Sequence, residues 1–211
     1  FDGDSQDDFG TFLGGLTMLW GGTAEPVDVP DAQTSFAYAA LDLDGDALVD
    51  LVALGGGDAG NAPPSPQVFH NLGDRAFDAP ISAATGGVGQ GFATQVIDWD
   101  LDGDPDVYGC NDAGGIYGPN VALLDEDGAL IVGDARGADI EAGCMSASFG
   151  DVDGDGTLDI YIAQAGPQRL LVDQGDAGFV DAAAVLINLS YPPEQMGWSS
   201  VTVDADNDAR P

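Results

Sequence analysis

Apolar and polar positions repeat along this chain in a unit of about 50 residues. Each unit begins with a stretch in which small and large residues alternate, at 35–41, 91–97, 144–149 and 197–203. Such alternation predicts a β-strand in a crowded environment. An Asp- and Gly-rich segment follows, and then a more apolar, β-branched run such as 160–163. We therefore expect each unit to open with a β-hairpin whose turn is the acidic segment.

Two further strands are expected to complete each unit. Third strands are predicted at 16–20, 67–71, 120–124 and 168–172, and Gly/Asp turns at 73–74, 126–128 and 174–176 lead to fourth strands near 76–77, 129–132 and 178–180. One short helical turn is expected within 181–189. Four antiparallel strands in each period of about 50 residues are typical of a propeller blade. The predicted fold is all-β, one region over 1–211, with blade periods near 1–41, 42–97, 98–150 and 151–203 and a partial repeat at 204–211.

The acidic segments have the composition of a calcium loop. In the segment 151–159, aspartates occupy positions 1, 3, 5 and 9, and the segments 42–50 and 98–106 follow the same spacing. Calcium takes six to eight oxygen ligands at about 2.3–2.6 Å, often including a backbone carbonyl at position 7. The candidate ligands are Asp42, Asp44, Asp46, Leu48, Asp50, Asp98, Asp100, Asp102, Asp104, Asp106, Asp151, Asp153, Asp155, Thr157 and Asp159.

Two incomplete copies of the loop lie near the ends of the given sequence. Their candidate ligands, which carry less weight, are Asp2, Asp4, Asp8, Asp204, Asp206 and Asp208. The three complete loops predict about three or more structural Ca²⁺ ions.

An EF-hand, a β-roll and a metal-free turn all match the acidic segments less well. An EF-hand needs flanking helices and an acidic residue at position 12, where this chain has Ala53, Gly109 and Ile162. The short Gly-rich nonapeptides of a β-roll are absent from the sequence. A turn that binds nothing would leave several carboxylates to repel one another without a counter-charge.

The net charge narrows the classes of partner. The formal charge is −33, with four arginines and no lysine. Binding to nucleic acid is excluded because phosphates need a basic surface, and an anionic membrane surface is disfavoured for the same reason. About half of the acidic residues fall in the loops, and an acidic, salt-adapted proteome would also account for the missing lysines. No apolar run approaches the ~18 residues of a membrane span, so no membrane insertion is expected.

The cysteines and the histidine give little support for catalysis. Cys110 and Cys144 would meet if their blades were neighbours, so a disulfide and a buried free pair are both open. The single histidine, His70, is in a predicted third strand and is expected to be structural. No nucleophile motif accompanies it, and we therefore do not expect an enzyme.

The loops and the strands around them resemble the FG-GAP/VCBS repeat family, the calcium-loop β-propellers that include integrin α-subunit heads. The resemblance is carried by 149–162 and 170–179, and 196–208 is similar to the bacterial subgroup associated with ASPIC/UnbV domains. It implies one calcium ion in the first hairpin of each blade and a propeller of seven or eight blades, of which about four repeats are present. Ala47 departs from the family, which often has Gly there.

The resemblance implies a secreted or cell-surface interaction module. We expect a calcium-stabilised propeller that binds a protein or carbohydrate ligand, as adhesion modules do, and that associates with further blades or another chain. Two alternatives stay open: an architectural repeat in a larger surface protein or filament, and the propeller of a polysaccharide lyase-like or dehydratase-like enzyme.

The four repeats can be arranged in two ways. Pairing of 197–203 with 8–15 would close a small ring and bring the two incomplete loops together. The alternative is an open arc of three whole blades and two half-blades, which the family's usual blade number favours.

Overall fold

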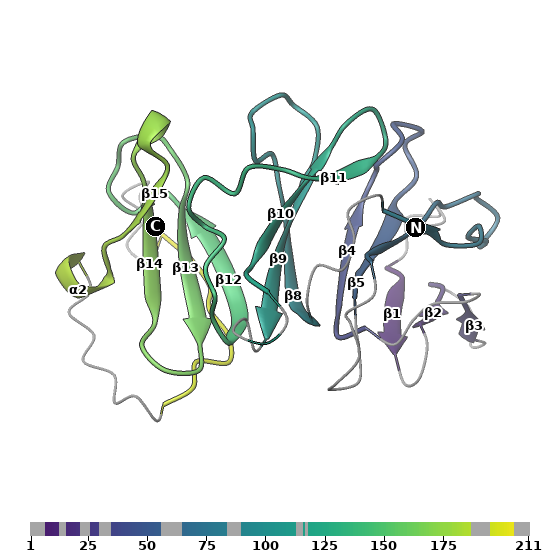
Figure 1. Cartoon of the computed structure of the whole chain (residues 1–211). Helices are drawn as coiled ribbons and strands as arrows, with labels where there is room; N and C mark the ends of the chain where they lie inside the picture. The colour runs from purple at the N-terminus through teal and green to yellow at the C-terminus, as the bar shows by residue number, and fades with distance from the viewer. Residues whose placement is uncertain are drawn as a thin grey trace.

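Four antiparallel sheets stand side by side in a row in the computed structural model (Figure 1). It describes residues 7–12, 16–21, 26–29, 35–55, 65–83, 90–112, 116, 118–186 and 195–204. The helices with described bounds are a 3₁₀ turn at Gly175–Ala177 and α2 at Ala183–Leu186, and α2 lies in the segment where a helical turn was predicted. The fold is all-β, as predicted.

Each sheet corresponds to one sequence repeat. The first contains β1 (Phe9–Phe12), β2 (Leu16–Leu19) and β3 (Pro26–Asp28). The second contains β4 (Ala37–Leu41), β5 (Asp50–Leu54), β6 (Gln67–Phe69) and β7 (Ile81–Ser82). The third contains β8 (Gln90–Ile97), β9 (Asp106–Asp112), β10 (Val121–Asp125) and β11 (Leu130–Val132). The fourth contains β12 (Cys144–Gly150), β13 (Asp159–Gln164), β14 (Arg169–Asp173) and β15 (Phe179–Asp181).

One strand prediction was wrong, and one was met only by a short pairing. The segment 197–203 is not a strand, since the described residues there show one bridge, Ala165↔Met196. A strand needs a ladder partner, and no ladder to 197–203 is present among the described residues. The predicted outer pairing at 76–77 is a single bridge, between Phe77 and Asn71, and the Phe77 ring stacks on Trp20 with ring centroids 6.1 Å apart. The outer strand itself, β7, follows at Ile81–Ser82 and pairs with the start of β6.

The hydrophobic core consists of three clusters, each between neighbouring sheets. One joins β2 to β5 and β6, the next joins β4–β6 to β9 and β10, and the third joins β9 and β10 to β12–β14. Both faces of β5 are therefore covered: Leu51 and Ala53 face the first cluster, and Val52 and Leu54 face the second. Burial on two faces explains why second strands read as apolar runs rather than as alternating patterns.

Glycines allow the second and third sheets to approach closely. Leu54 projects from β5 onto Gly91 in β8 and Gly109 in β9. A Cβ at Gly109 would lie 2.6 Å from Leu54 Cδ1 and 2.9 Å from Val121 Cγ1. Those separations are shorter than any van der Waals contact, so any larger side chain at position 109 must displace its neighbours.

A disulfide connects the third and fourth sheets. Cys110 in β9 is bonded to Cys144 at the start of β12, with Cα atoms 5.3 Å apart. The sequence had left this pairing open. Closing a loop of 34 residues stabilises the fold by about 4 kcal/mol in the chain-entropy model.

The described strands form an open row and not a closed ring. β1 pairs with β2 alone in its sheet, and no ladder joins 7–12 to 195–204. The first sheet and the fourth lie at opposite ends of the row in Figure 1. The segment 195–204 runs beside β12, where Ser146 Oγ contacts Ser200 Oγ at 3.2 Å and Thr202 Oγ1 contacts Ser148 Oγ at 3.1 Å. The number of blades in the complete propeller stays a prediction.

The close approach at Gly109 predicts the effect of one added methyl group. Gly109→Ala should lower the free energy of unfolding by about 1–3 kcal/mol through overpacking, measured by denaturant titration. The double variant Gly109→Ala/Leu54→Ala should lose less than the sum of the two single changes, because truncating Leu54 vacates the space that the new methyl group needs. Strict additivity would contradict the contact.

Candidate metal centre

The three complete acidic loops are the turns of the first hairpins. They join β4 to β5, β8 to β9 and β12 to β13. Each loop begins after a first strand and ends at an aspartate that opens the second strand: Asp50, Asp106 or Asp159. The sequence placed all three loops correctly.

Side chains at positions 3 and 5 shape each loop in the same way. The position-3 carboxylate accepts the N–H of position 5: Asp44 Oδ1 at 3.2 Å, Asp100 Oδ1 at 3.3 Å and Asp153 Oδ1 at 3.3 Å. The position-5 carboxylate accepts the N–H of position 7: Asp46 Oδ1 at 2.8 Å, Asp102 Oδ1 at 3.0 Å and Asp155 Oδ1 at 2.8 Å. These consecutive Asx turns curl the backbone around the carboxylates, and the second oxygen of each position-3 and position-5 aspartate makes no bond within this pattern.

The position-9 aspartate fastens the loop to the third strand. Asp50 is 1% exposed and accepts the N–H of Leu43 at 3.0 Å through Oδ2 and that of Asn71 at 2.8 Å through Oδ1. Asp106 accepts from Trp99 and Asp125, at 2.7 and 2.8 Å, and Asp159 accepts from Val152 and Asp173, at 2.8 and 2.9 Å. We call this repeated arrangement the position-9 clamp.

The clamp gives these aspartates a role that the sequence analysis did not foresee. They were predicted only as metal ligands, yet both oxygens of each already accept a backbone N–H. A carboxylate oxygen has a second lone pair, so a clamped aspartate still has acceptor capacity toward a cation. The signal for the clamp was present as an Asn or Asp before each Gly turn, at Asn71, Asp125 and Asp173.

Electrostatics at the clamps favour a bound cation. Burial raises the pKa of Asp106 and of Asp159 above the usual range. Their backbone hydrogen bonds lower the pKa but do not offset the burial, and neighbouring loop carboxylates raise it further. Burial also raises the pKa of Asp125. At the exposed tip, hydrogen bonds from Thr157 lower the pKa of Asp155. A divalent cation would relieve the repulsion among the inner carboxylates.

The loops bring part of each predicted ligand set together. Ligand atoms within 4.8 Å of one another come from Asp98, Asp100 and Asp106 in one loop and from Asp151, Asp153 and Asp159 in another. In the first loop, one group contains Asp42, Asp44 and Asp46, and a second contains Asp44, Asp50 and His70. Asp102, Asp104, Asp155, Leu48 and Thr157 are in the loops but outside these groups.

Two orphaned oxygens show that the loops fit a cation. Asp42 Oδ1 and Asp98 Oδ1, both at position 1, are buried without a hydrogen-bond partner. A buried carboxylate oxygen without a donor is costly unless an ion compensates it. The sets in 98–106 and 151–159 contain only oxygen, which is the donor chemistry of hard divalent cations such as Ca²⁺ and Mg²⁺.

Four of the candidates in the incomplete loops, Asp2, Asp4, Asp206 and Asp208, lie outside the described residues. Asp8 Oδ1 accepts the N–H of Gly21 at 2.6 Å, and Asp8 and Asp204 belong to opposite ends of the row of sheets. A meeting of the two half-loops, which only the closed-ring arrangement predicts, is therefore not seen at Asp8 and Asp204.

The loop backbone is left-handed at positions 4 and 6 in every copy. Four of these six positions are glycine, which adopts positive φ without strain. The exceptions are Ala47, with φ of 71°, and Leu101, with φ of 65°. The sequence had singled out Ala47 as a departure but had overlooked Leu101, whose side chain is 82% exposed.

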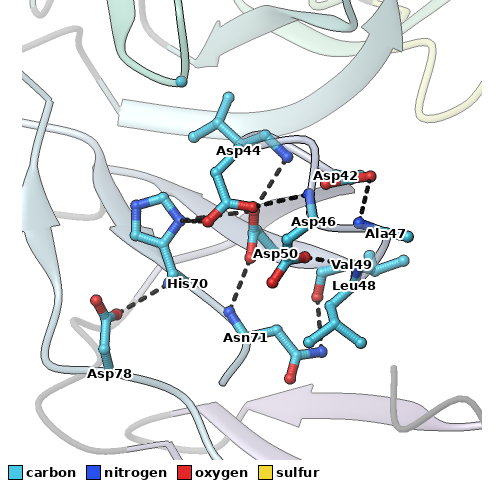
Figure 2. A network of polar contacts seen from close by, with 12 residues as sticks. Asp42, Asp44, Asp46, Ala47, Leu48, Val49, Asp50, His70, Asn71 and Asp78 are labelled. Carbon is cyan, nitrogen blue, oxygen red and sulfur yellow. Dashed lines mark hydrogen bonds and ion pairs between the residues drawn. The ribbon is translucent and has the colours of Figure 1, made fainter. Parts of the chain in front are cut away.

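His70 approaches the first loop from the third strand (Figure 2). Its Nδ1 atom lies 3.7 Å from Asp44 Oδ2 and 3.6 Å from Asp50 Oδ2. The backbone N–H of His70 donates to Asp78 Oδ1 at 2.9 Å. The expectation of a structural histidine overlooked its position beside the acidic loop.

Sequence comparison identifies the repeat. The family model described as FG-GAP-like repeat matches residues 42–109 and 151–211, more than half of the chain, and all three complete loops lie within the matched ranges. The chain belongs to the FG-GAP-like repeat family. This confirms the resemblance to FG-GAP repeats, whereas the ASPIC/UnbV subgroup stays a prediction. A search of curated proteins finds no match.

A solved structure with a related arrangement is a lectin from Agrocybe aegerita, described as recognising non-reducing terminal N-acetylglucosamine. It is 18% identical, with a TM-score of 0.46, and the match covers 83% of this FG-GAP chain and 47% of the lectin. The FG-GAP chain thus spans about half of the lectin's length. In the part of the FG-GAP chain that the structure describes, no helix is both long and apolar enough to cross a membrane.

The strained backbone at Leu101 predicts a stabilising substitution. Leu101→Gly should raise the free energy of unfolding by about 0.5–1 kcal/mol, because a left-handed non-glycine residue costs about 1–2 kcal/mol and part of this gain is lost to the entropy of the unfolded chain. Leu158→Gly is the matched control, since Leu158 is also exposed but has no positive φ, and it should destabilise the protein. Denaturant titration measures both, and a loss of stability in Leu101→Gly would contradict the strain.

Proposed function

We propose that this FG-GAP repeat chain is a calcium-stabilised, extracellular interaction module. The observation that carries the proposal is the threefold repetition of one loop geometry, in which Asx turns and a clamped aspartate direct several carboxylates toward one point. Two of the loops also contain a buried oxygen without a hydrogen-bond donor. Aspartates at positions 1, 3 and 9 would hold the ion in the loops 98–106 and 151–159, and Asp42, Asp44 and Asp46 would hold it in the first loop.

The ions would act on structure and not on a substrate. A Ca²⁺ ion neutralises the loop carboxylates and fixes the first hairpin, while the clamp passes this constraint to the third strand. Both cysteines are in the disulfide, so no thiol remains as a nucleophile. These features favour an interaction module or an architectural repeat over an enzyme.

An extracellular location agrees with the chemistry of the chain. Disulfides persist in oxidising compartments. Calcium sites of extracellular modules bind with dissociation constants of about 10⁻⁴–10⁻³ M, in the range where external calcium keeps them filled. The acidic surface, with a formal net charge of −33, keeps such a module apart from anionic polymers.

An apolar row offers a surface for a ligand. Phe36, Phe92 and Trp198 each lie six residues before the first position of an acidic loop. The rings of Phe36 and Phe92 are 5.9 Å apart, and those of Phe92 and Trp198 are 6.5 Å apart. Phe36 is 50% exposed and Trp198 is 65% exposed. Exposed rings suit a ligand with a flat apolar face, such as a sugar ring or a protein side chain.

Calcium removal should destabilise the module. Chelation should lower the melting temperature, and added Ca²⁺ should restore it beyond the effect of sodium chloride at equal ionic strength, because binding to the folded state adds RT ln(1 + [L]/Kd) for each ion. Isothermal titration should show about three sites, one fewer in Asp98→Asn, and no change in the control Asp176→Asn, whose exposed carboxylate lies outside the loops. A melting temperature that does not respond to chelation would contradict structural calcium.

The apolar row predicts where a ligand binds. In a glycan-array screen of the calcium-loaded chain, Trp198→Ala should abolish the signal for any glycan that the unmodified chain binds. Val203→Ala removes an exposed apolar side chain of the same segment outside the row and should leave the signal unchanged. Absence of any glycan signal would favour a protein ligand or the architectural alternative, and a signal unaffected by Trp198→Ala would place binding elsewhere.

A further inference from the structure

The first loop differs from the other two by an imidazole nitrogen. His70 Nδ1 is buried and has no hydrogen-bond partner. It lies 3.7 Å from Asp44 Oδ2 and 3.6 Å from Asp50 Oδ2 (Figure 2). Asp50 is 1% exposed, whereas the Asp44 side chain is 41% exposed and opens the cluster to solvent. The nitrogen therefore faces two carboxylates, one of which belongs to a side chain that reaches solvent.

The distances suit a shared cation better than hydrogen bonds. A charge-assisted N–H···O bond would bring the nitrogen and oxygen to about 2.7–2.9 Å. Two ligands that bind one metal ion at about 2.0–2.2 Å with tetrahedral angles lie about 3.3–3.6 Å apart. The separation from Asp50 Oδ2, 3.6 Å, is at the upper end of that range, and the separation from Asp44 Oδ2, 3.7 Å, is just beyond it. Coordination through Nδ1 would leave the proton on Nε2, the tautomer of a neutral imidazole ligand.

The register of the sheets shows that this nitrogen is specific to the second sheet. Each position-9 clamp reaches the backbone N–H of Asn71, Asp125 or Asp173. The residues one place earlier are therefore equivalent: His70, Leu124 and Val172. Neither Leu nor Val can bind a metal, so the other two loops have oxygen ligands only.

We propose that Asp44, Asp50 and His70 form a site for a transition-metal ion such as Zn²⁺. This site would prefer a different metal from the two all-oxygen loops, 98–106 and 151–159, which suit calcium. Imidazole nitrogen favours zinc and its first-row neighbours, whereas carboxylate and carbonyl oxygens alone suit calcium. Water would complete the coordination on the exposed side of Asp44. The contrast with the calcium loops rests on the proposed function, but zinc binding at His70 does not require that the other loops bind calcium.

The single histidine makes a direct test possible. In the untagged chain saturated with Ca²⁺, zinc chloride should shift the ¹⁵N resonance of His70 Nδ1, and the shift should saturate at one equivalent. This measurement uses the unmodified protein, so it does not depend on the folding of a variant. An unchanged imidazole spectrum at two equivalents of zinc would overturn the proposal.

Matched variants test the ligand set. His70→Leu, which introduces the side chain found at the equivalent position 124, should weaken zinc binding at least tenfold in isothermal titration. Asp44→Asn should do the same, whereas Asp100→Asn, the corresponding change in the next loop, should leave the zinc affinity unchanged. Equal zinc affinity and stoichiometry in the unmodified chain and His70→Leu would overturn the proposal.

A calcium titration in the absence of zinc distinguishes the zinc-site proposal from the proposal of a calcium-stabilised module. Calcium binding that persists at 98–106 and 151–159 in His70→Leu, together with loss of the zinc site, supports both. Zinc binding at His70 in a chain that binds no calcium would retain the zinc site and reject the calcium function.

Discussion

The position-9 clamp is the interaction on which the repeat depends. A buried carboxylate takes one N–H from the loop that precedes it and another from the third strand, and it opens the second strand itself. One side chain thereby fixes three chain segments relative to one another. Asp50, Asp106 and Asp159 do this with nearly the same distances. Removing such an acceptor would leave two buried N–H groups unsatisfied, each at a cost of about 1–3 kcal/mol.

The clamp also joins metal binding to folding. The same aspartate that holds the third strand belongs to the carboxylate groups around the prospective ion. An ion that neutralises those groups therefore acts on the sheet as a whole and not merely on an exposed turn. Because the sheets pack face to face through three apolar clusters, loosening one hairpin disturbs the neighbouring sheets as well.

Much of this architecture could be predicted because its causes are local. Three patterns were informative: the period of the Asp loops, the alternation within the first strands, and the Gly turns. Together they placed all but one of the first strands, and the hairpins that those strands open, within one or two residues. The failures have non-local causes. β7 was missed because it pairs with Gln67 and Val68 at the start of β6, beyond the short pairing of Phe77 with Asn71 that follows the Gly turn. The approach of His70 to Asp44 depends on a register that no sequence spacing shows, and the clamp needs the third strand to be in place. The strain at Leu101 was missed because a leucine in a loop gives no sign of its backbone angles until the turn around it is known.

The disulfide between Cys110 and Cys144 determines how the chain would carry tension. It connects the end of β9 to the start of β12, so a pull along the backbone passes from one sheet to the next through the sulfur atoms. β10 and β11 lie inside the closed loop and are shielded from the load. The 34 residues that the bond spans represent roughly 110 Å of extended chain. While the bond is intact that length cannot be released, and under reducing conditions the same module becomes extensible.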